Sequence, residues 1–319
     1  MKYRKLGNSN LEVSVVTLGT MSFPYSAFAQ IKPSDAVVDR AGVLSIVKSA
    51  LDSGINLFDT AEGYGCGFSE DLLGEALKVL NKREKVVVCT KVGRPGESVS
   101  ESCNLTRTNI LFRCEQSLKR LRTDYIDLYL AHRPDLITPA EETVSAFETL
   151  RQQGKIRHFG ISEFDPRQMT AVMEYGMPVA NQLAYSLVER RIDIDVRKFC
   201  VTNNIGIMVY SPLAKGLLSA KYSRDHLPPP VDDRREHHFK PQTLDQFLAV
   251  AEGVRTISKE LGVTPSTVAL AWCLAQPGIT TVIPGAKSSE QILEAASAAD
   301  LELSPSVLQR LDAISVPAN

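Results

Sequence analysis

The chain has 319 residues, of which 44% are hydrophobic and 23% charged, and its formal net charge is −1. This composition is typical of globular proteins and excludes disordered and fibrous chains, while the near-zero charge argues against a nucleic-acid partner. No apolar run reaches the roughly 18 residues of a membrane span, and the N-terminus lacks the apolar core of a secretory signal.

Short apolar runs rich in Val and Ile alternate with segments of helical periodicity. The N-terminal segment differs, and it predicts a hairpin that turns at Gly7-Asn8 or Ser9-Asn10. Helices are expected at 69–80 and after an N-cap signal at Thr106 or Thr108. The expected strands are 15–19, 55–59, 86–92, 126–132, 156–162, 179–184, 205–213 and 280–285.

Near-continuous apolar strands joined by helices imply a parallel sheet that is buried on both faces. Eight such units favour a closed (β/α)8 TIM barrel, formed as one domain by residues 1–319, over an open doubly wound sheet. The N-terminal hairpin is expected to close the lower mouth of this barrel. The long loop after the seventh strand, 221–242, is interpreted equally well as a lid or cofactor clasp and as an irregular surface excursion.

The six cysteines form no CxxC pair and have no histidine at ligand spacing. We therefore expect reduced thiols in a cytoplasmic protein, with neither disulfides nor a metal site. Cys66 is either a small residue in a tight loop or an oxidisable thiol.

Four titratable residues fall at the C-terminal ends of the second to fourth strands: Asp59, Tyr64, Lys91 and His132. In a barrel of this kind those ends form the catalytic mouth. A lysine or aspartate in an apolar strand is costly unless paired, so Asp59 and Lys91 are expected to form an ion pair. The ion pair alone would fit a structural role as well as a catalytic one. The presence of Tyr64 and His132 at the same rim favours a catalytic site.

The chemistry of these groups predicts an acid catalyst. Tyrosine has a pKa near 10, and the ammonium of Lys91, held by Asp59, is expected to lower it. A neutral His132 can donate a hydrogen bond to a carbonyl oxygen. Since the chain shows no nucleophile, metal cluster or second carboxylate at hydrolase spacing, a cofactor is expected to supply the other reactant, such as a hydride.

A nucleotide-binding signal is present but weak. The glycines of "GYGCG" (63–67) do not fit the Rossmann pattern. The stretch "VIPGAKSSEQILEAA" (282–296) reads as a strand, a glycine turn and a helix start, where Ser288 or Ser289 and backbone amides suit a phosphate. Lys287 adds a cation suited to an extra 2′-phosphate.

Taken together, several motifs resemble those of the aldo-keto reductases along nearly the whole chain: "LFDTAEGYG", "CTKVG", "DYIDLYLAH", "GKIRHFGIS", "NQLAYS", "YSPLAKGLL" and "IPGAK". The bacterial general-stress and inositol-cluster members and the potassium-channel beta-subunit-like branch look most similar. The resemblance implies a (β/α)8 barrel that uses NADPH to reduce an aldehyde or ketone. It assigns Tyr64 as general acid, Lys91 and Asp59 as its tuning pair, and His132 as the group that orients the carbonyl.

The resemblance also implies a cofactor site, with Gln182 on the nicotinamide amide, Tyr210 stacked on its ring and Lys287 near the 2′-phosphate. One departure is Glu163, where many relatives have asparagine. It either bonds the carboxamide or points away and leaves Ser162 and Gln182 to do so. The residues implied in cofactor binding are Gly19, Thr20, Asp59, Ser162, Glu163, Gln182, Tyr210, Ser211, Leu213, Lys215, Lys221, Arg234, Gly285, Ala286, Lys287, Gln291 and Glu294.

Other readings remain open at this point. Lys91 could form a Schiff base in a lyase or aldolase barrel, although pairing with Asp59 opposes this. The chain could also bind NADPH as a redox sensor with little turnover, or be a structural barrel without catalysis. The sequence leaves the natural carbonyl substrate and the oligomeric state undetermined.

Overall fold

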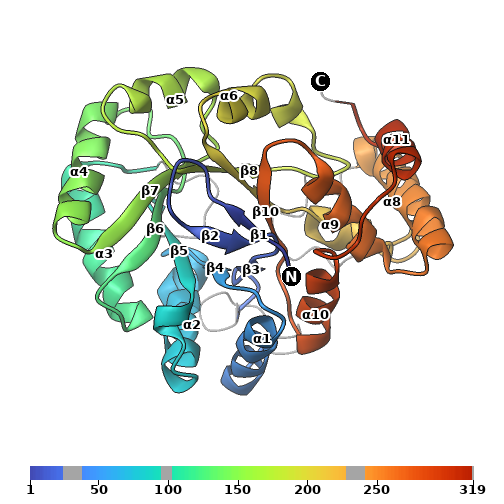
Figure 1. The fold of residues 1–319 in the computed structure, drawn as a ribbon, viewed down its shortest axis with the longest axis horizontal. Coiled ribbons are helices and arrows are strands. Elements are labelled where there is room, and N and C mark those ends of the chain that lie inside the picture. The colour runs from blue at the N-terminus through green and yellow to red at the C-terminus, as the bar shows by residue number, and fades with distance from the viewer. Residues whose placement is uncertain (24–37, 95–102, 228–240, 318–319) are drawn as a thin grey trace.

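Eight parallel strands lie side by side in the order β10-β9-β8-β7-β6-β5-β4-β3 (Figure 1). The computed structural model describes residues 1–23, 38–94, 103–227 and 241–317. Backbone bridges Val16–Val282 and Gly19–Gly285 join β3 to β10 and close the barrel. The strands are β3 (Leu18–Gly19), β4 (Leu57–Asp59), β5 (Val87–Val92), β6 (Ile126–Ala131), β7 (Ile156–Ser162), β8 (Ala180–Ala184), β9 (Gly206–Tyr210) and β10 (Ile279–Ile283). The predicted (β/α)8 barrel is confirmed.

The seventh barrel strand is shorter than predicted. It was expected over 205–213, but it ends at Tyr210 because the chain turns at Ser211, where φ is +53°. The following short 3₁₀ segment η4 (Ala214–Ser219) also contains left-handed residues. Residues 228–240 of the long loop lie outside the described part of the chain, so the choice between a lid and a surface excursion is left as it was.

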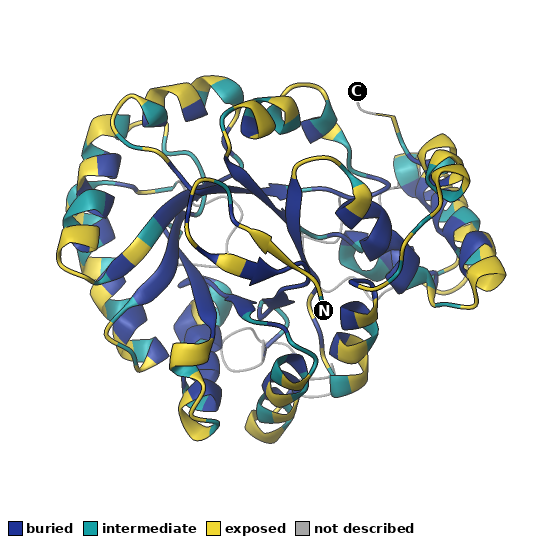
Figure 2. Cartoon of the chain, viewed as in Figure 1, coloured by how far each residue is buried: buried dark blue, intermediate teal, exposed yellow. Residues whose placement is uncertain are grey.

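Helices surround the strands and turn their buried faces toward them (Figures 1 and 2). A local signal explains the start of α5, where Asp165 forms a capping box with Gln168. Thr106 occupies the N-cap position of α3, but its side chain makes no capping hydrogen bond. The helices are α1 (Arg40–Asp52), α2 (Phe68–Val79), α3 (Arg107–Leu121), α4 (Ala140–Gln152), α5 (Pro166–Met173), α6 (Val196–Thr202), α8 (Pro241–Leu261), α9 (Pro265–Ala275), α10 (Ser289–Ser297) and α11 (Pro305–Ile314).

The N-terminal hairpin closes one end of the barrel, as predicted. Its strands β1 (Tyr3–Lys5) and β2 (Glu12–Ser14) pair antiparallel, and the N–H of Ser9 bonds the carbonyl of Leu6, which places Gly7 and Asn8 at the turn. Leu6 and Val13 are fully buried against residues from inside the barrel, such as Leu128 and Met208. Figure 1 shows the hairpin in front of the barrel strands, so the catalytic mouth lies on the far side.

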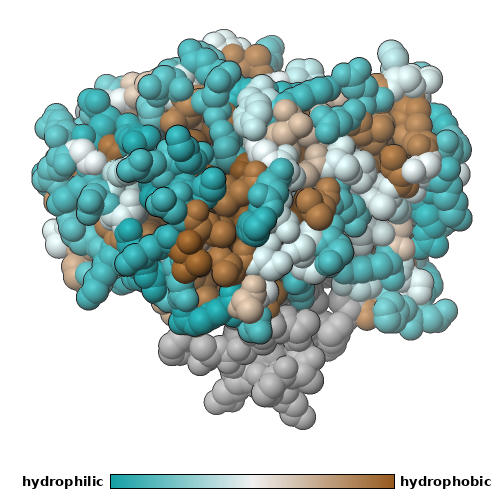
Figure 3. Space-filling view, turned by 60° about the horizontal axis from the view of Figure 1, so that its bottom comes forward, coloured by the Kyte–Doolittle hydropathy of each residue, from teal (hydrophilic) through white to brown (hydrophobic). Residues whose placement is uncertain are grey.

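The face of the molecule shown in Figure 3 is largely polar. In Figure 3 hydrophilic side chains cover most of the face shown, and apolar ones form a patch near its middle. Among the described residues, no helix is both long enough and apolar enough to cross a membrane.

Candidate active site

Asp59 and Lys91 form a buried ion pair at the barrel mouth, as expected. Asp59 is the last residue of β4, and Lys91 lies near the end of the neighbouring β5. Nζ of Lys91 lies 2.8 Å from Oδ2 of Asp59 and donates to the carbonyl oxygen of Thr60 at 2.8 Å. Since Lys91 is fully buried and Asp59 is 3% exposed, the pair is shielded from water.

Tyr64 and His132 complete the group. Lys91 Nζ donates to the hydroxyl of Tyr64 at 3.2 Å. The rings of Tyr64 and His132 meet edge to face, with centroids 5.9 Å apart. His132 directly follows β6, and its backbone N–H donates to the carbonyl of Val92. The structure thus brings together the four residues that the sequence placed on separate strands.

The loop that carries Tyr64 is a left-handed turn. Gly65, Cys66 and Gly67 have φ values of 58°, 53° and 92°. At Gly67 a side chain would also collide with Arg120, whose atoms lie 2.7 Å from the position of an added Cβ. Glycine adopts these φ values without steric cost, and at Gly67 it also leaves room for the Arg120 side chain. Cys66 is exposed on the same turn.

The electrostatics correct one expectation. The pKa of Tyr64 lies above its usual range, because burial raises it more than the neighbouring Lys91 lowers it. Burial alone would lower the pKa of Lys91, but Asp59 and Tyr64 more than offset this and raise it, so the lysine stays charged. A charged, paired lysine disfavours the Schiff-base reading.

His132 is held neutral. Burial and then the nearby cations Lys91, Arg94 and Arg133 keep the pKa of His132 well below its ordinary value. Its Nδ1 atom is buried and has no hydrogen-bond partner among the residues that the structure describes. A neutral imidazole of this kind keeps one N–H for an incoming ligand.

Glu163, which the sequence left undecided, directs its carboxylate to Arg133 and to the backbone of Ala184. Its Oε1 accepts the N–H of Ala184 at 2.8 Å, and its Oε2 lies 3.2 Å from Nη1 of Arg133. Both oxygens therefore have partners within the protein. Ser162 donates its hydroxyl to the carbonyl of Gln182 at 3.0 Å.

The first and last barrel strands carry the next predicted cofactor residues. Gly19 and Gly285 face each other across the closing bridge, and Ala286 accepts a hydrogen bond from Ser22. Thr20 is fully buried; its N–H and hydroxyl donate to the carbonyl of Asp59, and its own carbonyl accepts from the hydroxyl of Ser69, so its polar groups are bonded within the protein.

The segment after β9 has an unusual backbone. Ala214, Lys215 and Gly216 follow Leu213 with φ values of 47°, 56° and 91°, three left-handed residues in a row. Lys221 lies close by, since its Nζ would be 3.4 Å from a Cβ at Gly216. Strained backbone of this kind concentrates at ligand sites.

The start of α10 is a well-capped helix N-terminus. Ser288 is its N-cap and accepts the N–H of Gln291, whose side chain in turn accepts the N–H of Lys287. Glu294, farther along α10, accepts a hydrogen bond from the hydroxyl of Thr264, the N-cap of α9. Arg234 lies outside the described residues.

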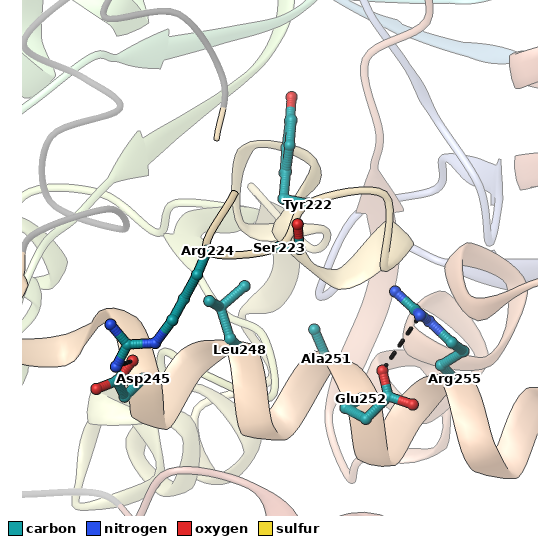
Figure 4. Close-up of a pocket in the computed structure, with 8 residues that line it drawn as sticks. All are labelled: Tyr222, Ser223, Arg224, Asp245, Leu248, Ala251, Glu252 and Arg255. Atoms are coloured by element: carbon teal, nitrogen blue, oxygen red, sulfur yellow. Dashed lines mark ion pairs between the residues drawn. The ribbon is translucent and has the colours of Figure 1, made fainter. Parts of the chain in front are cut away.

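A separate pocket of about 330 Å³ lies between residues 222–224 and α8 (Figure 4). Arg224 pairs with Asp245, and Arg255 lies 3.3 Å from Glu252, so each cation of the lining has a carboxylate. The lining includes none of the predicted catalytic residues. In the described part of the chain, no group of three or more His, Cys, Asp and Glu could hold a metal ion.

Two residues of the site were missed by the sequence reasoning. Glu62 is 2% exposed, and its Oε1 accepts the N–H of Gly93 at the end of β5. Arg133 contacts Glu163 and the hydroxyl of Tyr210. The only available signals were their positions, Glu62 between Asp59 and Tyr64 and Arg133 beside His132.

A barrel whose titratable side chains gather at the C-terminal strand ends has the architecture of a barrel enzyme. The family model described as "Aldo/keto reductase family" matches residues 15–316. The chain belongs to the aldo/keto reductase family, an oxidoreductase family that uses nicotinamide cofactors.

Individual relatives cover nearly the whole chain. It is 31% identical to a probable voltage-gated potassium channel subunit beta of Oryza sativa subsp. japonica, over 98% of this chain and 96% of the relative. It is 32% identical to the NADH-specific methylglyoxal reductase of Escherichia coli (strain K12), over 95% of each chain. The structure of a glycerol dehydrogenase from Gluconobacter oxydans is similar with a TM-score of 0.85 and 29% identity, covering 98% of this chain and 94% of that one.

Proposed function

We propose that the protein reduces an aldehyde or ketone to the alcohol, with NADPH as the reductant and Tyr64 as the proton donor. The observation that carries this proposal is the position of Lys91 Nζ, which contacts both Asp59 Oδ2 and the Tyr64 hydroxyl. The ammonium stabilises the phenolate that remains when Tyr64 gives up its proton. Asp59 keeps that ammonium charged and in place.

In this proposal His132 orients the carbonyl group of the substrate. Its neutral imidazole donates a hydrogen bond to the carbonyl oxygen and holds that oxygen beside the Tyr64 hydroxyl. The Tyr64 hydroxyl lies 3.2 Å from Nζ of Lys91, and the Tyr64 ring is edge-on to that of His132. One carbonyl oxygen can therefore accept from both Tyr64 and His132.

The described residues fit a nicotinamide dinucleotide. Its phosphates suit the capped start of α10 with Lys287, and the left-handed segment with Lys215 and nearby Lys221. Tyr210 would line the nicotinamide. When bound, NADPH supplies the hydride. The preference for NADPH over NADH is supported by Lys287, while one relative is named as NADH-specific.

The test measures NADPH consumption by the purified protein with an electron-poor aromatic aldehyde. We expect turnover that falls by roughly 10²- to 10⁴-fold in Tyr64→Phe. Tyr175→Phe, at a 49% exposed tyrosine, is the matched control and should keep full activity. NADPH binding without turnover would instead support the sensor function, and the same assay with NADH decides the cofactor preference.

A further inference from the structure

A polar network joins the C-terminal ends of four neighbouring strands, β6 to β9. Arg133 follows β6, Glu163 follows β7, Ala184 ends β8 and Tyr210 ends β9. Nη1 of Arg133 lies 3.2 Å from Oε2 of Glu163, and Nη2 donates to the hydroxyl of Tyr210 at 3.3 Å. The N–H of Ala184 donates to Oε1 of Glu163 at 2.8 Å. We call these four residues the rim network.

The backbone at Glu163 adopts a left-handed conformation. Its φ is +62°, a left-handed conformation that is unfavourable for a residue with a side chain. The backbone is fixed there because the N–H of Glu163 bonds the carbonyl of Gln182 at 3.0 Å. From this position the carboxylate reaches both Ala184 and Arg133.

The ion pair is better shielded than a surface pair. The side chain of Glu163 is 17% exposed and that of Arg133 is 38% exposed. A guanidinium is a rigid planar fork, so it can hold a carboxylate and a phenol at the same time in fixed directions. Tyr210 is half-buried, and its hydroxyl is hydrogen-bonded to the carboxylate of Glu163 as well as to Arg133.

We propose that Arg133 and Glu163 are positioning residues that hold the ring of Tyr210 in one orientation for the nicotinamide. The inference rests on the proposed function, in which Tyr210 lines the cofactor. Arg133 acts through the Tyr210 hydroxyl, and Glu163 acts through Arg133 and through its own hydrogen bond with that hydroxyl.

A double-mutant cycle of Arg133→Met and Tyr210→Phe tests this, with the dissociation constant of NADPH as the readout. Tyr210→Phe keeps the ring and removes only the hydroxyl. We expect Arg133→Met to weaken NADPH binding roughly fivefold in the wild-type background and less than about twofold in Tyr210→Phe. Glu163→Gln should weaken binding in the same direction, and its effect should shrink equally in Tyr210→Phe.

The outcomes separate the inference from the proposed function. Wild-type protein that neither binds nor oxidises NADPH overturns the proposed function before any variant is compared. Normal wild-type binding with an equal loss from Arg133→Met in both backgrounds would show that Arg133 touches the ligand directly, and an unchanged dissociation constant would show a purely structural network. If Arg133→Met lowers the melting temperature, Arg133→Lys replaces it, because it keeps the charge and loses the fork.

Discussion

Nε2 of Gln182 donates a hydrogen bond to Oδ1 of Asp59 at 2.8 Å, although the two residues are 123 positions apart in the chain. The other oxygen of the same carboxylate pairs with Lys91. Asp59 is therefore held from β8 and from β5 at once. Gln182, which the resemblance assigns to the nicotinamide, also supports the catalytic ion pair.

Replacing Gln182 by methionine should therefore destabilise the fold. The variant keeps the side-chain length but leaves Oδ1 of Asp59 buried without this donor, at a cost of about 1–3 kcal/mol. Urea denaturation measures the loss. Gln309→Met, at an exposed glutamine on α11, is the matched control and should change stability by less than about 0.5 kcal/mol. Equal midpoints for Gln182→Met and the wild type would contradict a supporting role.

Breaking the buried ion pair should cost more than breaking a surface pair. Lys91→Met leaves Asp59 charged in a buried site and is expected to cost about 3–5 kcal/mol. Arg310→Met removes an ion pair with Glu260 in which both side chains are about half exposed and accessible to water, and it should cost much less.

A double-mutant cycle tests whether the charges of Asp59 and Lys91 stabilise each other. The double variant Asp59→Asn/Lys91→Met removes both charges, so its loss of stability should be smaller than the sum of the two single losses. Additive losses in denaturant titrations would show that the two charges do not stabilise each other.

Glu62 should make stability fall as the pH rises. Burial raises the pKa of its carboxyl from 4.5 to about 7, and the N–H of Gly93 and the charge of Arg113 offset this only in part; Glu70 and Arg120 also face it. Between these two values the unfolded chain has lost the proton and the folded one has kept it. The free energy of unfolding therefore decreases across this window, by on the order of 3 kcal/mol.

Glu62→Gln isolates this effect, since glutamine keeps an acceptor for Gly93 and cannot ionise. The wild-type free energy of unfolding, minus that of the variant, should decline from about pH 4.5 to about pH 7 and then level off. Urea titrations at several pH values give this difference. A difference that does not vary with pH would show that the carboxyl ionises equally in both states.

The barrel and the meeting of its four titratable residues could be predicted from the sequence because parallel topology places successive strand ends at one mouth. The strand positions of Asp59 and Lys91 were sufficient to predict their ion pair. The hydrogen bond from Gln182 to Asp59 could not be predicted, because it depends on side-chain direction across the barrel interior. The net pKa shift of Tyr64 was mispredicted, since burial and the charge of Lys91 act in opposite directions and a sequence gives the size of neither.

Backbone conformation limited the prediction in the same way. The strand predicted over 205–213 continues as an apolar pattern, yet it ends at Tyr210 because Ser211 is left-handed. The direction of the Glu163 side chain was also undetermined, since its partner Arg133 follows a different strand. Both features depend on tertiary contacts rather than on local composition.

His132 should stay neutral across the range in which histidines usually titrate. Burial and the surrounding cations lower its pKa, so its ring resonances in an NMR titration should not shift between about pH 6 and pH 8. His132→Gln assigns the signal. Because the unfolded chain binds this proton below about pH 6.5 and the folded chain does not, His132 lowers stability as the pH falls, opposite in sign to Glu62. A midpoint near 6.5 for this signal would refute the neutral assignment.

Gly7, in the hairpin turn, should tolerate substitution by alanine less well than Gly154. An added Cβ would lie 2.2 Å from the carbonyl oxygen of Val179, in a backbone with φ of +51°. Gly154 also has positive φ, at +74°, but a Cβ there would meet nothing within 4 Å. Gly154→Ala should therefore cost about 1 kcal/mol from backbone strain, and Gly7→Ala should cost more, because the hairpin must also move away from the barrel. Thermal unfolding of both variants measures the difference, and equal losses would mean that the hairpin is not packed against the barrel floor.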